Sequence, residues 1–185
     1  MLESFYAQCG PLQSKAEIDP QSLAALKSVL PEELHSLLSQ GKGSYMNGYL
    51  WIINPEEYKD IAEEIYSPVE QPSICFARDA FGGLFVWENG SIVYLNVRHG
   101  LSTVVGRKVS VFFNNILVDW DYISDQLHLE NYQPAKEMIG DLNADECYGY
   151  VPLLSLGGSE KPENLQKVKL REHISIIAQA AGKVS

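Results

Sequence analysis

The side chains best suited to nucleophilic or metal chemistry are scattered along this chain of 185 residues. Its cysteines and histidines are Cys9, Cys75, Cys147, His35, His99, His128 and His173. No two of them have the spacing of a zinc site, and the sequence has no HExxH or CxxC motif. It also lacks the glycine-rich phosphate loops and the GxSxG nucleophile elbow. We therefore predict neither a metal site nor a cofactor site.

One segment does place a possible nucleophile beside acids, because Cys147 follows Asp145 and Glu146. A thiol becomes nucleophilic as a thiolate, which needs positive surroundings, so this context predicts a semi-buried structural cysteine. The two acids could instead be half of a carboxylate pair for acid–base or metal chemistry. Adjacent residues of a strand point to opposite faces, which argues against that pairing. We expect the acids to cap a local turn or to meet a basic group on a partner.

A second charged pair, Arg78 and Asp79, precedes an FGG sequence in a predicted loop between strands. We interpret the pair as a contact that clamps this loop. In a ligand-binding alternative, a pocket near Arg78, His99 and Asp145 would bind a small molecule. A hydrolase that used Asp145, Glu146 and a histidine has no supporting motif.

The charge of the chain is unevenly distributed. It carries 24 acidic and 14 basic side chains, for a net charge of −10, which argues against direct binding of nucleic acid and favours a basic protein partner. Residues 119–146 contain eight acids and only one lysine or arginine, Lys136. The acids are Asp119, Asp121, Asp125, Glu130, Glu137, Asp141, Asp145 and Glu146.

Aromatic side chains lie among these acids and could anchor such a partner. Desolvated aromatic residues often carry much of the binding energy of an interface, while complementary charge accelerates association. The predicted partner-binding residues are Asp119, Trp120, Asp121, Tyr122, Asp125, Glu130 and Tyr132.

The centre of the chain has the pattern of a β-hairpin. Two apolar runs, residues 84–87 and 92–97, flank an Asn-Gly dipeptide at 89–90. This dipeptide is the strongest short signal for a type I′ turn, because both turn positions need a positive φ. The turn would pair Trp87 with Ile92. Both faces of the hairpin are apolar, so we expect a sheet that is covered on at least one side and partly on both.

Helical patterns precede and follow this predicted sheet. Periodicity and capping residues predict helices at 2–9, after Asp19-Pro20, from Pro31 to Gly41 and from Asn54 to Tyr66. Further strands are predicted at 45–53, 74–78 and 102–105, and after residue 106 the pattern becomes mainly helical apart from a short strand at 165–170. The fold class is therefore α+β, with a mostly antiparallel sheet of about five strands flanked by helices and a helical C-terminal part.

Size and composition predict a single compact unit over residues 1–185, built from an α+β part (1–106) and a mainly helical part (107–185). There is no apolar run long enough to span a membrane and no signal-peptide pattern at the N-terminus. The odd number of widely spaced cysteines fits a reducing compartment, so a cytoplasmic location is expected.

Two blocks of the sequence resemble a known family. The first comprises GYLWIINP at 48–55, FARDAFGGLFVW at 76–87, and Asn96-Val97 with Gly100. The second comprises DECYGYVP at 145–152, LGG at 156–158, Val168-Lys169 and Glu172-His173. In these blocks the chain resembles the GAD-like immunity proteins of type VI secretion systems, which protect bacteria from DNase toxins of the Tde type. The first half also looks distantly like the SMI1/KNR4 type of immunity domain.

The resemblance implies a small cytoplasmic antitoxin without catalytic activity, cofactor or membrane contact. It implies binding to a secreted toxin, a basic nuclease, by non-covalent occlusion; a regulatory GAD-like domain that binds a small ligand is the alternative. The oligomeric state is left open, with a monomer favoured. The motif residues are mostly glycine, proline and aromatic, which is typical of a structural scaffold. They include Trp51, Asn54, Pro55, Arg78, Phe81, Gly82, Trp87, Asp145, Glu146, Tyr148 and Gly149.

Overall fold

The computed structural model describes residues 2–127 and 129–185. The first half contains α1 (Glu3–Cys9), β1 (Gln13–Ala16), α2 (Pro20–Leu26), α3 (Glu32–Ser39), β2 (Lys42–Tyr45), η1 (Met46–Gly48), β3 (Leu50–Ile52), α4 (Pro55–Ile65), β4 (Ser73–Asp79), β5 (Leu84–Glu88), β6 (Ser91–Asn96), η2 (Val97–His99) and β7 (Leu101–Gly106). The second half contains α5 (Val109–Val111), η3 (Phe112–Ile116), α6 (Trp120–Leu127), η4 (Leu129–Asn131), α7 (Tyr132–Ile139), β8 (Glu146–Tyr150), η5 (Leu154–Leu156), η6 (Pro162–Asn164), β9 (Leu165–Lys169) and α8 (Leu170–Ala181). The predicted α+β class is confirmed.

Strands β1 to β7 form one antiparallel sheet in which each strand lies beside the next in the sequence, and β8 pairs with β9 in a separate two-stranded sheet. The central hairpin has the predicted register, with Trp87 opposite Ile92. Asn89 and Gly90 have φ values of 45° and 72°, as a type I′ turn requires. The Asn-Gly signal was therefore sufficient to fix the register of the middle of the sheet.

The sheet is larger than the predicted five strands. The predicted strand at 45–53 is two strands, β2 and β3, separated by the short turn η1. Met46 and Asn47 have positive φ there, so a continuous strand is impossible at this point. The additional strand β1 is short, polar and fully exposed, so it has no apolar alternation by which the sequence could reveal it.

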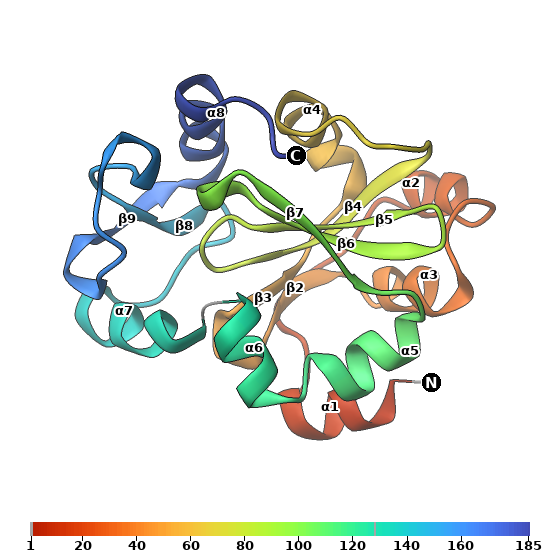
Figure 1. Ribbon diagram of the computed structural model, residues 1–185. Helices are drawn as coiled ribbons and strands as arrows, with labels where there is room; N and C mark the ends of the chain where they lie inside the picture. Colours follow the sequence, from red (N-terminus) through yellow and green to blue (C-terminus); the bar gives the residue numbers. More distant parts are fainter. Residues whose placement is uncertain (1, 128) are drawn as a thin grey trace.

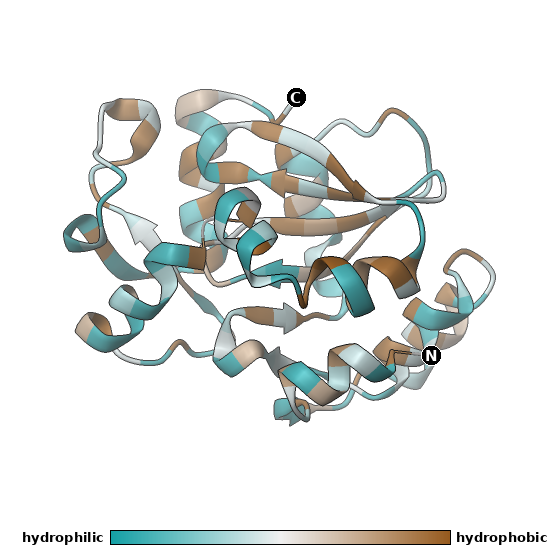
Figure 2. Cartoon of the chain, turned by 60° about the horizontal axis from the view of Figure 1, so that its bottom comes forward, coloured by the Kyte–Doolittle hydropathy of each residue, from teal (hydrophilic) through white to brown (hydrophobic). Residues whose placement is uncertain are grey.

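Helices cover both faces of the large sheet (Figure 1). On one face, α4 and α8 pack on a cluster that includes Val86, Val93 and Ile174. On the other face, α1, α3, η3 and α6 pack on a cluster that includes Phe85 and Tyr94. Figure 2 shows the hydrophobic residues gathered on the central strands, with hydrophilic residues on the outer sides of the helices. The hairpin is thus buried from both sides.

Within residues 2–127 and 129–185, the structure contains no helix with both the length and the apolar character that crossing a membrane requires.

Candidate functional site

Helix α6 carries the first acids of the acidic segment and is held by local and tertiary contacts. Asp119 caps the helix, since its Oδ1 accepts a hydrogen bond of 3.1 Å from the backbone N–H of Tyr122. Ile123 and Leu127 are buried in the core on the inner side of the helix. Trp120 stays 52% exposed, so a large apolar side chain is available at the surface of a helix that is itself firmly seated.

A groove runs along this helix. It has a volume of about 540 Å³. Its walls come from α1, η1, α6 and the segment around η4 and α7, and its lining residues include Cys9, Asn47, Trp120, Ser124, Glu130 and Tyr132. Trp120 and Ser124 are four positions apart, so they occupy the same stripe of α6, and Asp121 and Asp125 form the adjacent stripe. The groove therefore has an exposed indole in its wall, and two exposed carboxylates lie on the next stripe of the same helix.

Tyr132 forms part of the wall of this groove. Only 6% of it is exposed, its hydroxyl donates a hydrogen bond of 2.7 Å to the carbonyl of Asn47, and its ring packs edge-on against Tyr49. Burial raises the pKa of its phenol above the ordinary value. Tyr132 therefore shapes the groove, whereas Trp120 is the groove-lining aromatic residue with a large exposed surface.

The structure divides the acidic segment into two parts. In the second part, Lys136 pairs with Asp141 at 2.8 Å, and Lys169 pairs with Asp145 at 2.6 Å and with Glu146 at 3.8 Å. These contacts lower the pKa of the Asp141 and Asp145 carboxyl groups, chiefly through the side-chain hydrogen bonds from the two lysines. Three of the four acids in the second half of the segment therefore meet a lysine of the chain itself.

The first part keeps its charge. Asp119, Asp121 and Asp125 have no ion pair with another described residue. Asp121 and Asp125 are exposed on α6 beside Trp120. Helix α6 therefore carries the predicted partner-binding acids whose charge is available to another molecule.

A second set of predicted residues meets where the β4–β5 turn contacts β8. Arg78 is fully buried, lies 4.6 Å from the centre of the Trp51 ring, and donates hydrogen bonds of 3.0 Å to the carbonyls of Asp79 and Ala144. Burial lowers the pKa of its guanidinium group. The Arg78 side chain thus joins the end of β4 to the loop before β8 through backbone carbonyls, and the Asp79 carboxylate forms an ion pair with Arg98, at 3.9 Å.

Asp79 organises the turn itself. Its Oδ1 accepts hydrogen bonds of 2.8 Å from the N–H groups of Phe81 and Gly83, and its Oδ2 accepts one of 2.6 Å from Tyr94. A Cβ atom at Gly83 would lie 2.5 Å from the Tyr94 ring and 2.6 Å from Asp79, so only glycine fits there. The backbone N–H of Tyr148 then donates a hydrogen bond of 2.8 Å to the carbonyl of Ala80, which joins β8 to this turn.

Two family models match the chain. The model described as GAD-like domain matches residues 1–99, and the model described as T6SS immunity protein Tdi1, C-terminal, matches residues 107–181. This chain belongs to the GAD-like, type VI secretion immunity family. The resemblance predicted from the sequence blocks is therefore confirmed, and the family implies a cognate toxin as partner.

Other comparisons concern the fold. The chain is similar to a protein whose solved structure is described as the crystal structure of Atu4351 from Agrobacterium tumefaciens. The two are 21% identical, with a TM-score of 0.77 over 98% of this chain and 90% of that one. At this identity the match shows a shared fold. No curated protein sequence matches the chain.

In this GAD-like chain, the residues considered above for nucleophilic or metal chemistry have structural contacts. Burial raises the pKa of the Cys147 thiol to about 12, which opposes thiolate formation. Glu146 accepts a hydrogen bond of 2.9 Å from the N–H of Asn143 and so caps the preceding turn. The described residues contain no group of histidine, cysteine or acidic side chains placed to hold a metal ion. His128 lies outside the described residues.

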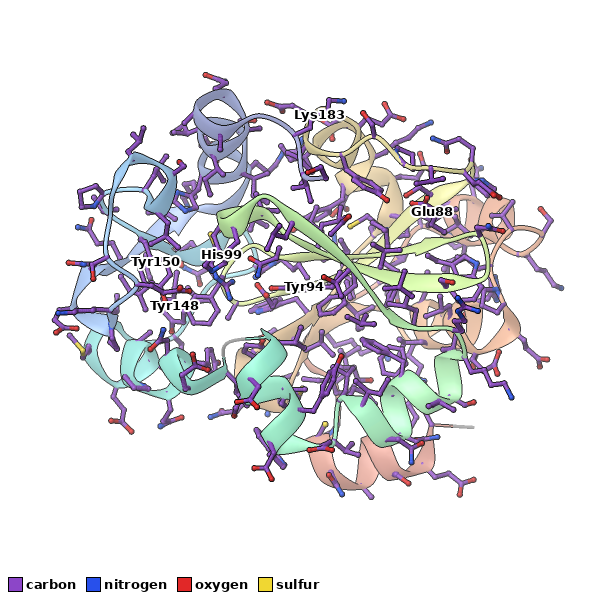
Figure 3. All side chains as sticks on the ribbon, in the orientation of Figure 1. Glu88, Tyr94, His99, Tyr148, Tyr150 and Lys183 are labelled. Carbon is purple, nitrogen blue, oxygen red and sulfur yellow. The ribbon has the colours of Figure 1, made fainter. Side chains whose placement is uncertain are left out.

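The three residues proposed for a small-ligand pocket contact different parts of this GAD-like fold. Arg78 clamps loops, Asp145 is exposed beside Lys169, and His99 contacts Glu160 at 3.0 Å. Figure 3 shows His99 beside the small sheet that carries Tyr148 and Tyr150, whereas Tyr94 lies in the large sheet. None of the described cavities is lined by Arg78, His99 and Asp145 together.

The sequence did not predict the opposite wall of the groove. This wall includes Cys9 from α1 and Met46 and Asn47 from η1. The Asn47-Gly48 dipeptide is a turn signal inside the predicted strand at 45–53, and it could have revealed η1. Nothing in the local sequence could have placed α1 opposite α6, because that contact depends on the tertiary packing.

Proposed function

We propose that this GAD-like chain is an immunity protein that neutralises a secreted toxin by non-covalent binding, and that the groove beside α6 is a principal contact surface. The observation that carries the proposal is the combination on one helix of exposed Trp120 with the exposed carboxylates Asp121 and Asp125, which form no ion pair with another described residue. The match to the type VI immunity model supports the role.

The chemistry of this surface favours a basic partner. An exposed indole supplies a large apolar contact, and adjacent carboxylates attract lysine and arginine side chains and accelerate association. A DNase needs a basic surface to hold phosphates. An acidic helix that covers such a surface would exclude DNA from it, and this is the means of neutralisation that we propose.

The proposal needs no catalytic step in the immunity protein. The toxin would stay neutralised only while the complex lasts. The affinity of the complex, and not a catalytic rate, would therefore determine how well the cell is protected. A tight complex would also stabilise the folded chain in proportion to the logarithm of toxin concentration over Kd.

Co-expression of this chain with the product of the neighbouring gene tests the proposal. We expect a stoichiometric complex on size-exclusion chromatography, rescue of growth in cells that express the toxin, and loss of DNA degradation by the purified toxin. Absence of both a complex and a growth rescue would refute the immunity role. A complex that leaves DNA degradation intact would refute the proposed occlusion of a nuclease.

A further inference from the structure

The two edges of the seven-stranded sheet differ in a way that bears on partner binding. At one edge, β1 has four residues, contains Lys15, and has an irregular register against β2. Short length, charge and irregularity are features that prevent an edge strand from pairing with another chain. At the other edge, β7 has the sequence LSTVVG, without any charge, and its Leu101 and Val104 are 56% and 57% exposed.

The register shows which backbone groups of β7 point away from the sheet. In a hairpin with a two-residue turn, the residues that flank the turn form the first hydrogen-bonded pair, so Glu88 and Ser91 bond to each other. Along β6, successive residues then bond alternately to β5 and to β7. The odd-numbered residues bond to β5 and the even-numbered residues bond to β7. Thr103 lies opposite Tyr94 and bonds inward. Its neighbours Ser102 and Val104 therefore direct their N–H and C=O groups outward.

One end of this edge already holds an extended segment. The N–H of Ser102 donates a hydrogen bond of 3.1 Å to the carbonyl of Ser185, whose own N–H donates one of 3.2 Å to the carbonyl of Gly100. This is the pattern of a parallel strand beside Leu101. The next outward groups are the Ser102 C=O and the Val104 N–H and C=O. No hydrogen bond joins them to another described residue, and β7 is the last strand in the order of the sheet.

We propose that the β7 edge receives an extended segment of the partner toxin, which adds a strand beside Ser102 and Val104. The inference rests on the proposed immunity function and adds a second contact surface to it. A segment with uncharged apolar residues fits this edge, because its side chains would pack on Leu101 and Val104 and its backbone would satisfy the outward groups.

A second copy of this chain fits the edge less well. Two β7 strands related by a two-fold axis run antiparallel, and an antiparallel neighbour that extends to Ser102 needs its N–H, which Ser185 already holds. Each chain also carries a net charge of −10, so two copies repel each other. A single strand from a basic partner that runs parallel to β7 needs only the Ser102 C=O and the Val104 groups, and its protein carries the opposite charge.

The substitution Val104→Pro tests the inference. Proline removes the outward N–H and places its ring in the path of an added strand, but it leaves the inward ladder to β6 intact. We expect an unchanged melting temperature and an affinity for the neighbouring gene's product at least about tenfold lower, the equivalent of one or two lost hydrogen bonds. Val104→Thr keeps the N–H and the branched shape, so it is expected to bind as the wild type does.

Two further measurements decide between the possible explanations. Thr103→Pro removes an inward N–H and is expected to lower the melting temperature, which checks the assignment of inward and outward residues. Hydrogen–deuterium exchange is expected to show protection of the Val104 amide when the toxin is bound.

Each outcome has a distinct meaning. Tight wild-type binding with an unchanged Val104→Pro affinity would overturn the strand addition and leave the immunity function standing. A wild-type dimer that Val104→Pro dissociates, with toxin affinity unchanged, would assign the edge to self-association and overturn the inference. Failure of the wild-type chain to bind the toxin at all would refute the proposed function, and this inference with it.

Discussion

The hydroxyl of Tyr94 donates a hydrogen bond of 2.6 Å to the Oδ2 of Asp79, and both side chains are buried. The same carboxyl group accepts two backbone N–H bonds at 2.8 Å, so it determines the shape of the β4–β5 turn. Because β8 is attached to this turn through Ala80, the buried Asp79 side chain helps to hold the large sheet against the small one, together with Arg78.

Removal of the Tyr94 hydroxyl is predicted to destabilise the fold. Tyr94→Phe leaves Asp79 Oδ2 without this donor in a buried site, and we expect the free energy of unfolding to fall by about 2 kcal/mol in chemical denaturation. Tyr6→Phe is the matched control, because the Tyr6 hydroxyl bonds to Gln40 at the surface. An equal loss in both variants would contradict the role assigned to the Tyr94 hydroxyl.

Gly149 is predicted to be intolerant of any side chain. A Cβ atom there would lie 2.6 Å from the His173 ring and 2.7 Å from Val168, so Gly149→Ala forces α8 away from β8 and is expected to cost about 1–3 kcal/mol of stability. A double-mutant cycle with His173→Ala checks the cause, because removal of the ring relieves the clash. Additive losses in that cycle would show that the clash is not responsible.

The acids of α6 are predicted to control the rate of complex formation. Asp121→Lys combined with Asp125→Lys reverses the exposed charge, and we expect association with the basic toxin to slow by about tenfold or more at low salt and to lose its salt dependence. Stopped-flow measurement over a range of ionic strength provides the check. Glu63→Lys combined with Glu172→Lys makes the same change in net charge on α4 and α8, in the opposite layer. A similar effect of both pairs would assign the steering to overall charge and not to α6.

Trp120 is predicted to act mainly on the dissociation rate. Its exposed side chain contributes little to the fold, so Trp120→Ala is expected to leave the melting temperature unchanged and to weaken toxin binding by about 2 kcal/mol, roughly thirtyfold. Met138→Ala is the control, since Met138 is an even more exposed apolar residue on α7. An unchanged affinity for Trp120→Ala would remove the groove from the proposed interface.

His173 predicts a specific dependence of stability on pH. Burial lowers its pKa below the ordinary value of 6.5, so between these two values the unfolded chain binds a proton that the folded chain does not. The free energy of unfolding is therefore expected to decrease as the pH falls below about 6.5, by at most about 1.4 kcal/mol per pH unit. Denaturation at several pH values measures this slope. It is expected to be reduced in His173→Gln and retained in His35→Gln.

Local sequence determined the parts of this protein in which neighbouring residues act on one another. Asn89-Gly90 fixed the hairpin register because only a tight turn with two positive φ values suits that dipeptide. Asp19 and Asn54 began helices because their side chains accept hydrogen bonds from backbone N–H groups of the first turn. The sequence blocks around Arg78 and Tyr148 were sufficient to recognise the family.

Only the tertiary structure decided which charges remain available and where the groove lies. The acidic segment is continuous in sequence, but Lys169 comes from β9 and reaches Asp145 across the small sheet. Among the residues that the structure describes, the acids of α6 have no such neighbour, so the available charge concentrates beside Trp120. The groove and the outward groups of β7 likewise depend on which strands and helices lie side by side, and contacts between residues more than a hundred positions apart leave no pattern in the local sequence.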